Sequence, residues 1–248
     1  MPHLQAAPAG PPTHPSVPRT PDAIAAEAAA CVAAGATTFH LHAYDDDGVE
    51  TLEARHVSAV LRAVRRACPG VPLNMTTFAE IEPDPDRRSA LVAGWADLPD
   101  LVAANQGETG IDELSVALLD RGVRVEACLL SLDDAHRFAR STGWERFARV
   151  VIEPLVDDED AAVVLDREIE AVVTGAGITL EQLHHGIGDA TWAVLRRAAA
   201  RGHGVRVGLE DVLTLPDGTD APSTAALVAA ARDLVASTPS TRAEQHAG

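Results

Sequence analysis

The feature of this sequence that most limits its fold is a repeated order of segments, in which a short apolar stretch precedes a longer amphipathic one. This order recurs eight times within the 248 residues. Strict alternation of strands and helices predicts parallel strands that are joined by right-handed crossovers. Eight such units in a chain of this length predict an α/β fold of the (β/α)8 TIM barrel class rather than an open sheet.

The segment boundaries follow from apolar runs and from capping residues. The expected strands cover residues 2–7, 37–43, 71–77, 100–105, 123–129, 149–154, 180–186 and 204–211. The expected helices cover residues 20–35, 51–70, part of 84–95, 111–122, 131–142, 158–177, 189–202 and 223–237. We expect one domain over residues 1–237 and a polar, disordered tail over 238–248.

Charge and composition exclude several classes of function. The formal net charge is −17, which argues against nucleic acid or a membrane as partner, because both select basic surfaces. All 20 basic residues are arginine. Without lysine the chain cannot form a Schiff base, anchor pyridoxal phosphate or build a lysine-bearing phosphate loop. Any carbonyl chemistry must therefore use a metal or a general base.

Cysteine usage and hydropathy bear on the compartment. Cys31, Cys68 and Cys128 are odd in number and lack the spacing of a metal site, so we expect reduced thiols in a cytoplasmic protein. No segment reaches about 18 consecutive apolar residues, and no basic region precedes an apolar run at the start. We therefore expect neither a signal peptide nor a membrane span.

Polar residues recur on the strand faces that should fill the barrel. Side chains alternate along a strand, and the face that meets the helices should be apolar, so the apolar set identifies the inward set. The residues expected to point inward are Thr38, His40, His42, Asn74, Thr76, Glu126, Glu153, His184, Arg206, Gly208 and Glu210. Asn105 ends a strand whose phase is ambiguous. Buried charges are costly unless they are paired or bind metal, so this interior indicates function.

Two histidines and one glutamate in this set suit a metal ion. His40 and His42 share a strand face with their Cα atoms about 6.6 Å apart. Glu210 belongs to another even-numbered strand, and alternate strands supply one interior layer of this fold. Two imidazoles and a carboxylate with open positions suit a catalytic divalent metal, with zinc as the default. The alternative is a pair of hydrogen-bonded core histidines beside an unrelated Glu–Arg pair.

Other polar residues permit two interpretations each. Arg206 is either a salt-bridge partner of Glu126 or Glu153 or a clamp for a substrate carboxylate. Asp211 is either a cap or loop residue or a general base. The acidic run at 45–48 favours a turn over a second metal site. The adjacent His184 and His185 are ambiguous. One of them is a candidate to hydrogen-bond a metal ligand, and His185 is expected to be structural.

Three stretches resemble one known family. "AACVAAGATTFHLHAYDDDG", "VPLNMTT" and "GHGVRVGLEDVLTLPDG" are similar to the β-keto acid cleavage enzymes, of which the 3-keto-5-aminohexanoate cleavage enzyme is the founding member. The likeness covers nearly the whole chain, and H-x-H and R-V-G-L-E-D are its most specific parts. It implies a zinc-dependent (β/α)8 barrel that condenses a β-keto acid with acetyl-CoA and releases acetoacetate and a new CoA thioester.

The resemblance also implies roles for individual residues. It implies that His40, His42 and Glu210 bind the metal, which would be zinc or another divalent ion. It assigns catalysis to Asp211, Arg206 and Glu126, and substrate binding to Thr76 or Thr77, Asn105 and Arg206. Two departures stand out, because the stretch after the first strand carries no charge and Tyr44 replaces a usual arginine.

The sequence therefore predicts a metal-dependent acyltransferase or carbon–carbon lyase that acts on a β-keto acid and a CoA thioester. A metal-dependent hydrolase or isomerase on the same barrel is the alternative enzyme. The alternative that is not an enzyme is a barrel that binds metal but has no catalytic turnover. We also expect a homo-oligomer.

Overall fold

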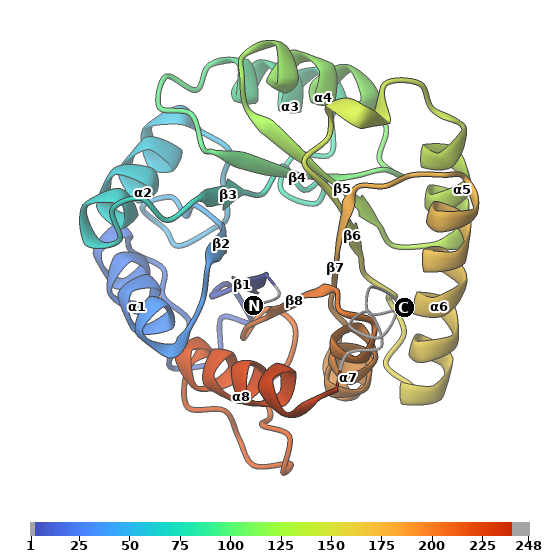
Figure 1. Ribbon diagram of the computed structural model, residues 1–248. Helices are drawn as coiled ribbons and strands as arrows, with labels where there is room; N and C mark the ends of the chain where they lie inside the picture. Colours follow the sequence, from blue (N-terminus) through green and yellow to red (C-terminus); the bar gives the residue numbers. More distant parts are fainter. Residues whose placement is uncertain (1–2, 240–248) are drawn as a thin grey trace.

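The computed structural model describes residues 3–239 and contains one closed barrel of eight parallel strands. Each strand pairs with its neighbours in chain order, and β1 also pairs with β8, as Figure 1 shows from one end of the barrel. The strands are β1 (Leu4–Ala6), β2 (Thr38–Leu41), β3 (Leu73–Met75), β4 (Leu101–Asn105), β5 (Arg124–Leu129), β6 (Arg149–Ile152), β7 (Glu181–His184) and β8 (Gly204–Val207). The predicted (β/α)8 barrel is confirmed.

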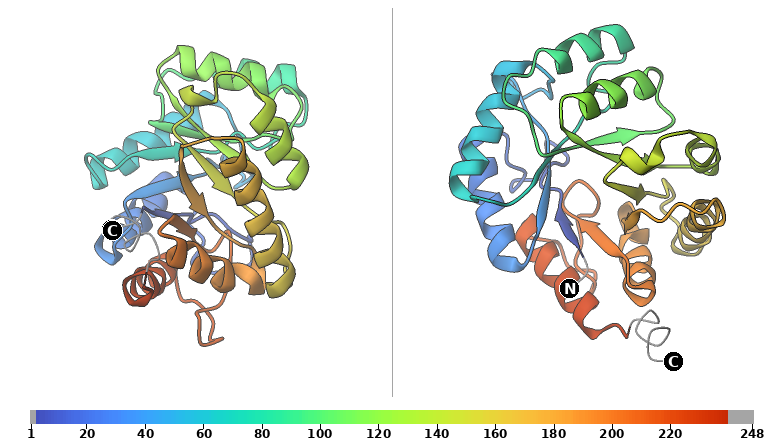
Figure 2. Two further views of the ribbon diagram at one scale, coloured as in Figure 1. Left: turned by 45° about the vertical axis from the view of Figure 1, so that its right-hand side comes forward. Right: turned by 45° about the horizontal axis from the view of Figure 1, so that its top comes forward.

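Eight helices surround the strands, and the tilted views show them as an outer ring (Figure 2). They are α1 (Pro21–Ala34), α2 (Ala54–Ala67), α3 (Pro85–Ala93), α4 (Ile111–Asp120), α5 (Leu132–Arg140), α6 (Glu159–Gly175), α7 (Thr191–Arg201) and α8 (Thr224–Ser237). Two short 3-10 turns, η1 (Trp144–Arg146) and η2 (Gly188–Ala190), were not expected. The expected tail at 238–248 falls mostly outside the described residues.

Helix starts follow the capping residues of the sequence. The Thr20 side chain accepts a hydrogen bond from the backbone N–H of Ala23 at the start of α1, where proline occupies the first turn. The helix ends at Gly35, whose φ of 120° lies in the region that favours glycine. Asp84 caps α3 in the same manner through the N–H groups of Asp86 and Arg87.

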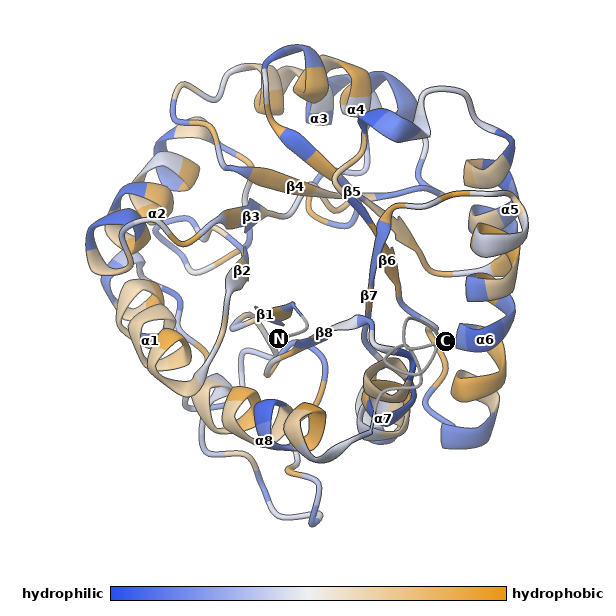
Figure 3. Cartoon of the chain, in the orientation of Figure 1, coloured by the Kyte–Doolittle hydropathy of each residue, from blue (hydrophilic) through white to orange (hydrophobic). Residues whose placement is uncertain are grey.

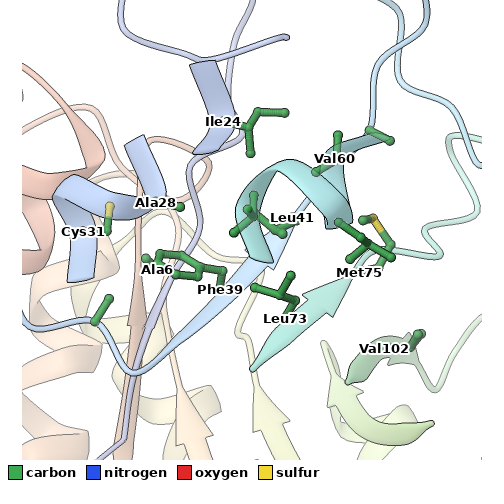
Figure 4. Close-up of a cluster of buried hydrophobic side chains, with 14 of the residues drawn as sticks. Ala6, Ile24, Ala28, Cys31, Phe39, Leu41, Val60, Leu73, Met75 and Val102 are labelled. Atoms are coloured by element: carbon green, nitrogen blue, oxygen red, sulfur yellow. The ribbon is translucent and has the colours of Figure 1, made fainter. Parts of the chain in front are cut away.

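The main core lies between the barrel and the helices. Apolar side chains on the outer strand faces, such as Phe39, Leu41 and Met75, pack against Ile24 and Val60 of the surrounding helices (Figure 4). Hydropathy colouring shows the same division, since α6 mixes polar and apolar residues while β4 and β6 are largely apolar (Figure 3). Burial of this apolar area is the main force that holds the ring of helices to the strands.

The three cysteines are free and buried, as expected of reduced thiols. Among residues 3–239, no helix combines the length and the apolar character that crossing a membrane requires.

The expected inward orientation of His184 is wrong. Its Nδ1 lies 2.6 Å from the Asp166 carboxylate on α6, and its ring stacks on His203, so it faces the helices. Asp166 is fully buried and also pairs with Arg197. A charged network between β7, α6 and α7 thus stabilises polar residues at positions where the alternation rule assumes apolar ones.

The barrel closes where β8 approaches β1. The register pairs Gln5 with Arg206 and Ala6 with Val207. Just beyond β8, a Cβ atom added to Gly208 would lie 1.8 Å from the backbone oxygen of Ala7. Only glycine permits this approach, which brings the residues after β8 next to the end of β1.

We expect Gly208→Ala to lower the free energy of unfolding by at least the roughly 1–3 kcal/mol typical of overpacking, because the contact is with backbone that cannot rotate away. Gly175→Ala is the matched control, since an added Cβ at this helical position meets nothing within 4 Å and should stabilise by about 0.5–1 kcal/mol. Denaturant titration of both variants checks this, and equal stability of the two would contradict the closure argument.

Candidate active site

Three side chains converge at the carboxyl ends of β2 and β8. The Nε2 atoms of His40 and His42 lie 3.2 Å apart. Glu210 approaches both rings, with one oxygen 3.6 Å from Nε2 of His40 and the other 3.6 Å from Nε2 of His42. Each of the three residues offers one possible ligand atom, and these three atoms all lie within 4.8 Å of one another.

This arrangement fits a bound divalent cation. Two nitrogen ligands about 2.1 Å from a tetrahedral zinc ion are separated by about 3.3–3.4 Å, which agrees with the imidazole spacing of 3.2 Å. Oε2 of Glu210 is buried and has no hydrogen-bond partner among the described residues. Two facing imidazole nitrogens and an unpartnered carboxylate oxygen are the donor set that such a cation requires.

The two histidines differ in their electrostatics. Burial lowers the pKa of His40 to about 3, which keeps its ring neutral. Burial also disfavours the charged form of His42, but the Glu210 and Glu50 carboxylates outweigh this effect and raise its pKa to about 9. A divalent cation at the site would compete with the proton on His42, because a metal-binding imidazole nitrogen must be deprotonated.

Residues behind the ligands orient each ring. Nδ1 of His40 lies 2.9 Å from Oδ1 of Asn74, whose Nδ2 donates a 2.7 Å hydrogen bond to Glu126. Nδ1 of His42 lies 3.0 Å from Oε2 of Glu50. Such outer contacts fix the tautomer and the direction of a metal-binding imidazole.

Sequence reasoning missed Glu50 because it lies in a loop, where no periodicity indicates direction. The acidic run before it forms the expected turn, since Asp45 accepts hydrogen bonds from the N–H groups of Asp47 and Val49. A short bridge between Tyr44 and Glu50 closes that turn and returns the chain to His42. Tyr44 itself lies under the Arg19 guanidinium, which is 4.8 Å from the centre of its ring.

Arg206 pairs with neither of the partners that were considered for it. Its guanidinium donates hydrogen bonds of 2.5 Å to Glu210 and 3.0 Å to Asp211. Glu126 pairs instead with Arg149, 3.2 Å away. Both salt-bridge alternatives for Arg206 are therefore wrong, and the arginine instead holds the two carboxylates that follow β8.

His185 is fully buried and contacts side chains on the inner side of the barrel, opposite to the direction of His184. Its ring nitrogens lie 3.2 Å from Glu153 and 3.3 Å from Asp211. Burial and the nearby Arg206 both disfavour the charged form of His185. The carboxylates of Glu153 and Asp211 outweigh these two effects and raise the pKa of His185 to about 9. The one-residue error in the direction of β7 thus concealed that His185 contacts Glu153, a residue of the cavity wall.

A cavity of about 280 Å³ opens onto the ligands. Besides the two histidines and Glu210, its lining includes Thr76, Asn105, Glu153 and Arg206. Thr77 points elsewhere and donates a hydrogen bond to the backbone oxygen of Ala103. Glu126 and Asp211 are absent from the lining among the described residues. Asp211 contacts the lining residue Arg206, whereas the Glu126 side chain reaches the lining residue His40 through Asn74.

Fold and site together define a (β/α)8 barrel protein with a candidate three-residue cation site at the carboxyl ends of its strands. Comparison with known families makes this class specific. The beta-keto acid cleavage enzyme family matches residues 3–147 and 160–246. The chain belongs to this family, which confirms the resemblance seen in the sequence.

Individual relatives agree with this assignment. The chain is 27% identical over 229 residues to a 3-keto-5-aminohexanoate cleavage enzyme from Fusobacterium nucleatum, covering 87% of this chain and 82% of the relative. It is 26% identical over 240 residues to a 3-oxoadipate:acetyl-CoA acetyltransferase from Cupriavidus necator, covering 87% and 80%. The solved structure of ObcA in a ternary complex with a C4-CoA adduct and oxalate matches with a TM-score of 0.74 at 17% identity, over 94% of this chain and 67% of that one, and supports the fold.

We expect the purified protein to carry about one divalent metal ion per chain, held by His40, His42 and Glu210. The double variant His40→Ala/His42→Ala should lose it, because a single carboxylate cannot hold the ion. Elemental analysis of both proteins after dialysis checks this. Equal metal content would rule out these ligands.

Glu50→Gln should weaken metal affinity by about 10–100-fold while the fold persists, because the amide cannot support His42 as a carboxylate does. Titration of the metal-free protein measures the dissociation constant directly. Glu53→Gln is a control from the same loop region, since Glu53 contacts Arg55 rather than a ligand. If both variants bind metal as the wild type does, Glu50 has no supporting role.

Proposed function

We propose that this enzyme cleaves a β-keto acid in a metal-dependent reaction with acetyl-CoA, giving acetoacetate and a new CoA thioester. The observation that carries the proposal is the convergence of His40, His42 and Glu210 at a cavity in a chain that has no lysine. A retro-Claisen reaction needs a carbonyl that accepts electrons. An imine cannot serve here, so a cation at this site is the remaining electrophile among those the sequence permits.

The relatives support the two substrates. One is named for cleavage of 3-keto-5-aminohexanoate, a β-keto acid, and the other for acetyl transfer between 3-oxoadipate and acetyl-CoA. We take acetyl-CoA as the co-substrate and zinc as the metal, because two imidazoles and a carboxylate are common zinc ligands. A homo-oligomer and a cytoplasmic location stay predictions.

The cation would polarise the keto and carboxylate oxygens of the substrate and stabilise negative charge as it develops on them. Arg206 lines the cavity and would hold an anionic group of the substrate, while its second task is to fix Glu210 and Asp211. Thr76 and Asn105 supply a hydroxyl and an amide on the opposite wall. Glu126 lies below and holds His40 through Asn74, so we assign it to positioning of that ligand.

Asp211 is proposed as a general acid–base group of the reaction. Its Oδ1 accepts the hydrogen bond from Arg206, whereas Oδ2 is buried without a hydrogen-bond partner among the described residues. An oxygen of that kind has a free lone pair that can accept a proton.

A panel of β-keto acids with neutral, anionic and cationic side chains, each incubated with acetyl-CoA and the metal-loaded protein, tests the function. We expect acetoacetate and a new CoA thioester from at least one member, in equal amounts. Consumption of a keto acid without acetyl-CoA would indicate a hydrolase instead. Absence of turnover across the panel by a metal-loaded protein would oppose the proposal.

Asp211→Asn should keep the metal and lose about 10²–10⁴-fold in kcat, because a general acid–base group typically contributes that much. Steady-state kinetics on the substrate that the panel identifies, with metal content measured in parallel, checks this. Unchanged kcat would assign Asp211 to holding Arg206 alone.

A further inference from the structure

The proposed acid–base group does not itself line the cavity. The Asp211 side chain is 2% exposed and lies behind Arg206, whereas the Glu153 side chain is 18% exposed and belongs to the cavity wall. Between them lies His185, which is fully buried and has one ring nitrogen beside each carboxylate. The three side chains come from the ends of three successive strands, β6, β7 and β8.

Desolvation of these three side chains costs free energy, which indicates that the series of contacts has a function. Three ionisable side chains occupy the interior, and neutral apolar residues of similar volume could fill the same space at lower desolvation cost. The helix-side partner of the adjacent histidine, Asp166, belongs to a different network on the far side of the strand. His185 thus faces away from that network and reaches the cavity only through its contact with Glu153.

We propose that Glu153, His185 and Asp211 act as one acid–base unit, in which Glu153 is the carboxylate that meets the substrate and His185 is the positioning residue that joins the two. This inference rests on the proposed function and adds Glu153 to its catalytic residues. It also explains how a buried aspartate influences a substrate in a cavity that it does not line.

The proton balance of the reaction is closed. Glu153 takes one proton from the methylene between the ketone and the carboxylate, and the electron pair of that C–H bond becomes part of the enolate. The enolate carbon forms a bond to the acetyl carbonyl carbon while the C–S bond of acetyl-CoA breaks and CoA leaves as the thiolate. The thiolate then attacks the former ketone carbon, whose bond to the methylene carbon breaks, so that the new CoA thioester forms and the electron pair stays on the acetoacetate carbon. The same carboxyl group returns the proton to that carbon.

The test follows exchange of the methylene protons of a β-keto acid in D2O by NMR, without acetyl-CoA, after subtraction of spontaneous exchange. We expect Glu153→Gln and His185→Gln each to retain metal and fold, and to lose enzyme-catalysed exchange by about 10²-fold. His184→Gln is the matched control, because it removes an equally buried imidazole that pairs with a carboxylate on the helix side. It should lower the melting temperature and leave exchange per folded molecule unchanged.

A double variant examines whether the residues form one unit. Losses in groups that act together do not multiply, so Glu153→Gln/Asp211→Asn should be no slower than the slower single variant by more than about threefold. Multiplying losses, or wild-type exchange in Glu153→Gln, would overturn the inference. If the wild type exchanges and turns over while these variants match it, only the inference fails. If the metal-loaded wild type does neither, the proposed function fails with it.

Discussion

Pairing of β1 with both β2 and β8 is the contact on which the site depends. The register sets Gln5 opposite Thr38 on one side and opposite Arg206 on the other, so the inward faces of β2 and β8 meet across a single strand. His40 lies two residues beyond Thr38 and Glu210 lies four beyond Arg206. The chain turns after β8, where the backbone N–H of Asp211 donates to the carbonyl oxygen of Gly208, and this turn lets Glu210 approach His40 to 3.6 Å. Gly208 permits the close approach that this register demands.

Much of this arrangement could be predicted because the outer strand faces are apolar. Where Phe39 and Leu41 had to face the helices, His40 and the residue two places on had to face inward. The same reasoning predicted that Glu210 points inward, although β8 ends at Val207 and Glu210 lies in the turn that follows, where strand alternation no longer applies. Period-two alternation locates interior side chains with this accuracy only while burial against helices decides the outer face.

The predicted direction of β7 was wrong because a polar contact, instead of apolar packing, stabilises the side chains on its outer face. In β7, Gln182 and His184 take outward positions, and the buried carboxylate of Asp166 compensates for the cost of a polar ring there. The sequence carries no sign of this partner, which lies on a helix. Glu50 escaped detection for a different reason, since a loop has no period and its contact with His42 depends on one turn of the chain. Both kinds of residue become visible only in three dimensions.

The distance in sequence between the ligands also orders events during synthesis. His40 and His42 leave the ribosome early, whereas Glu210 follows only after all eight strands have been made. Two imidazoles alone hold a divalent ion weakly, so firm capture must await docking of the last strand against the first. A metal ion held by all three residues would favour the closed barrel over chains in which that strand is undocked, because ligand binding stabilises only the state that offers the complete site.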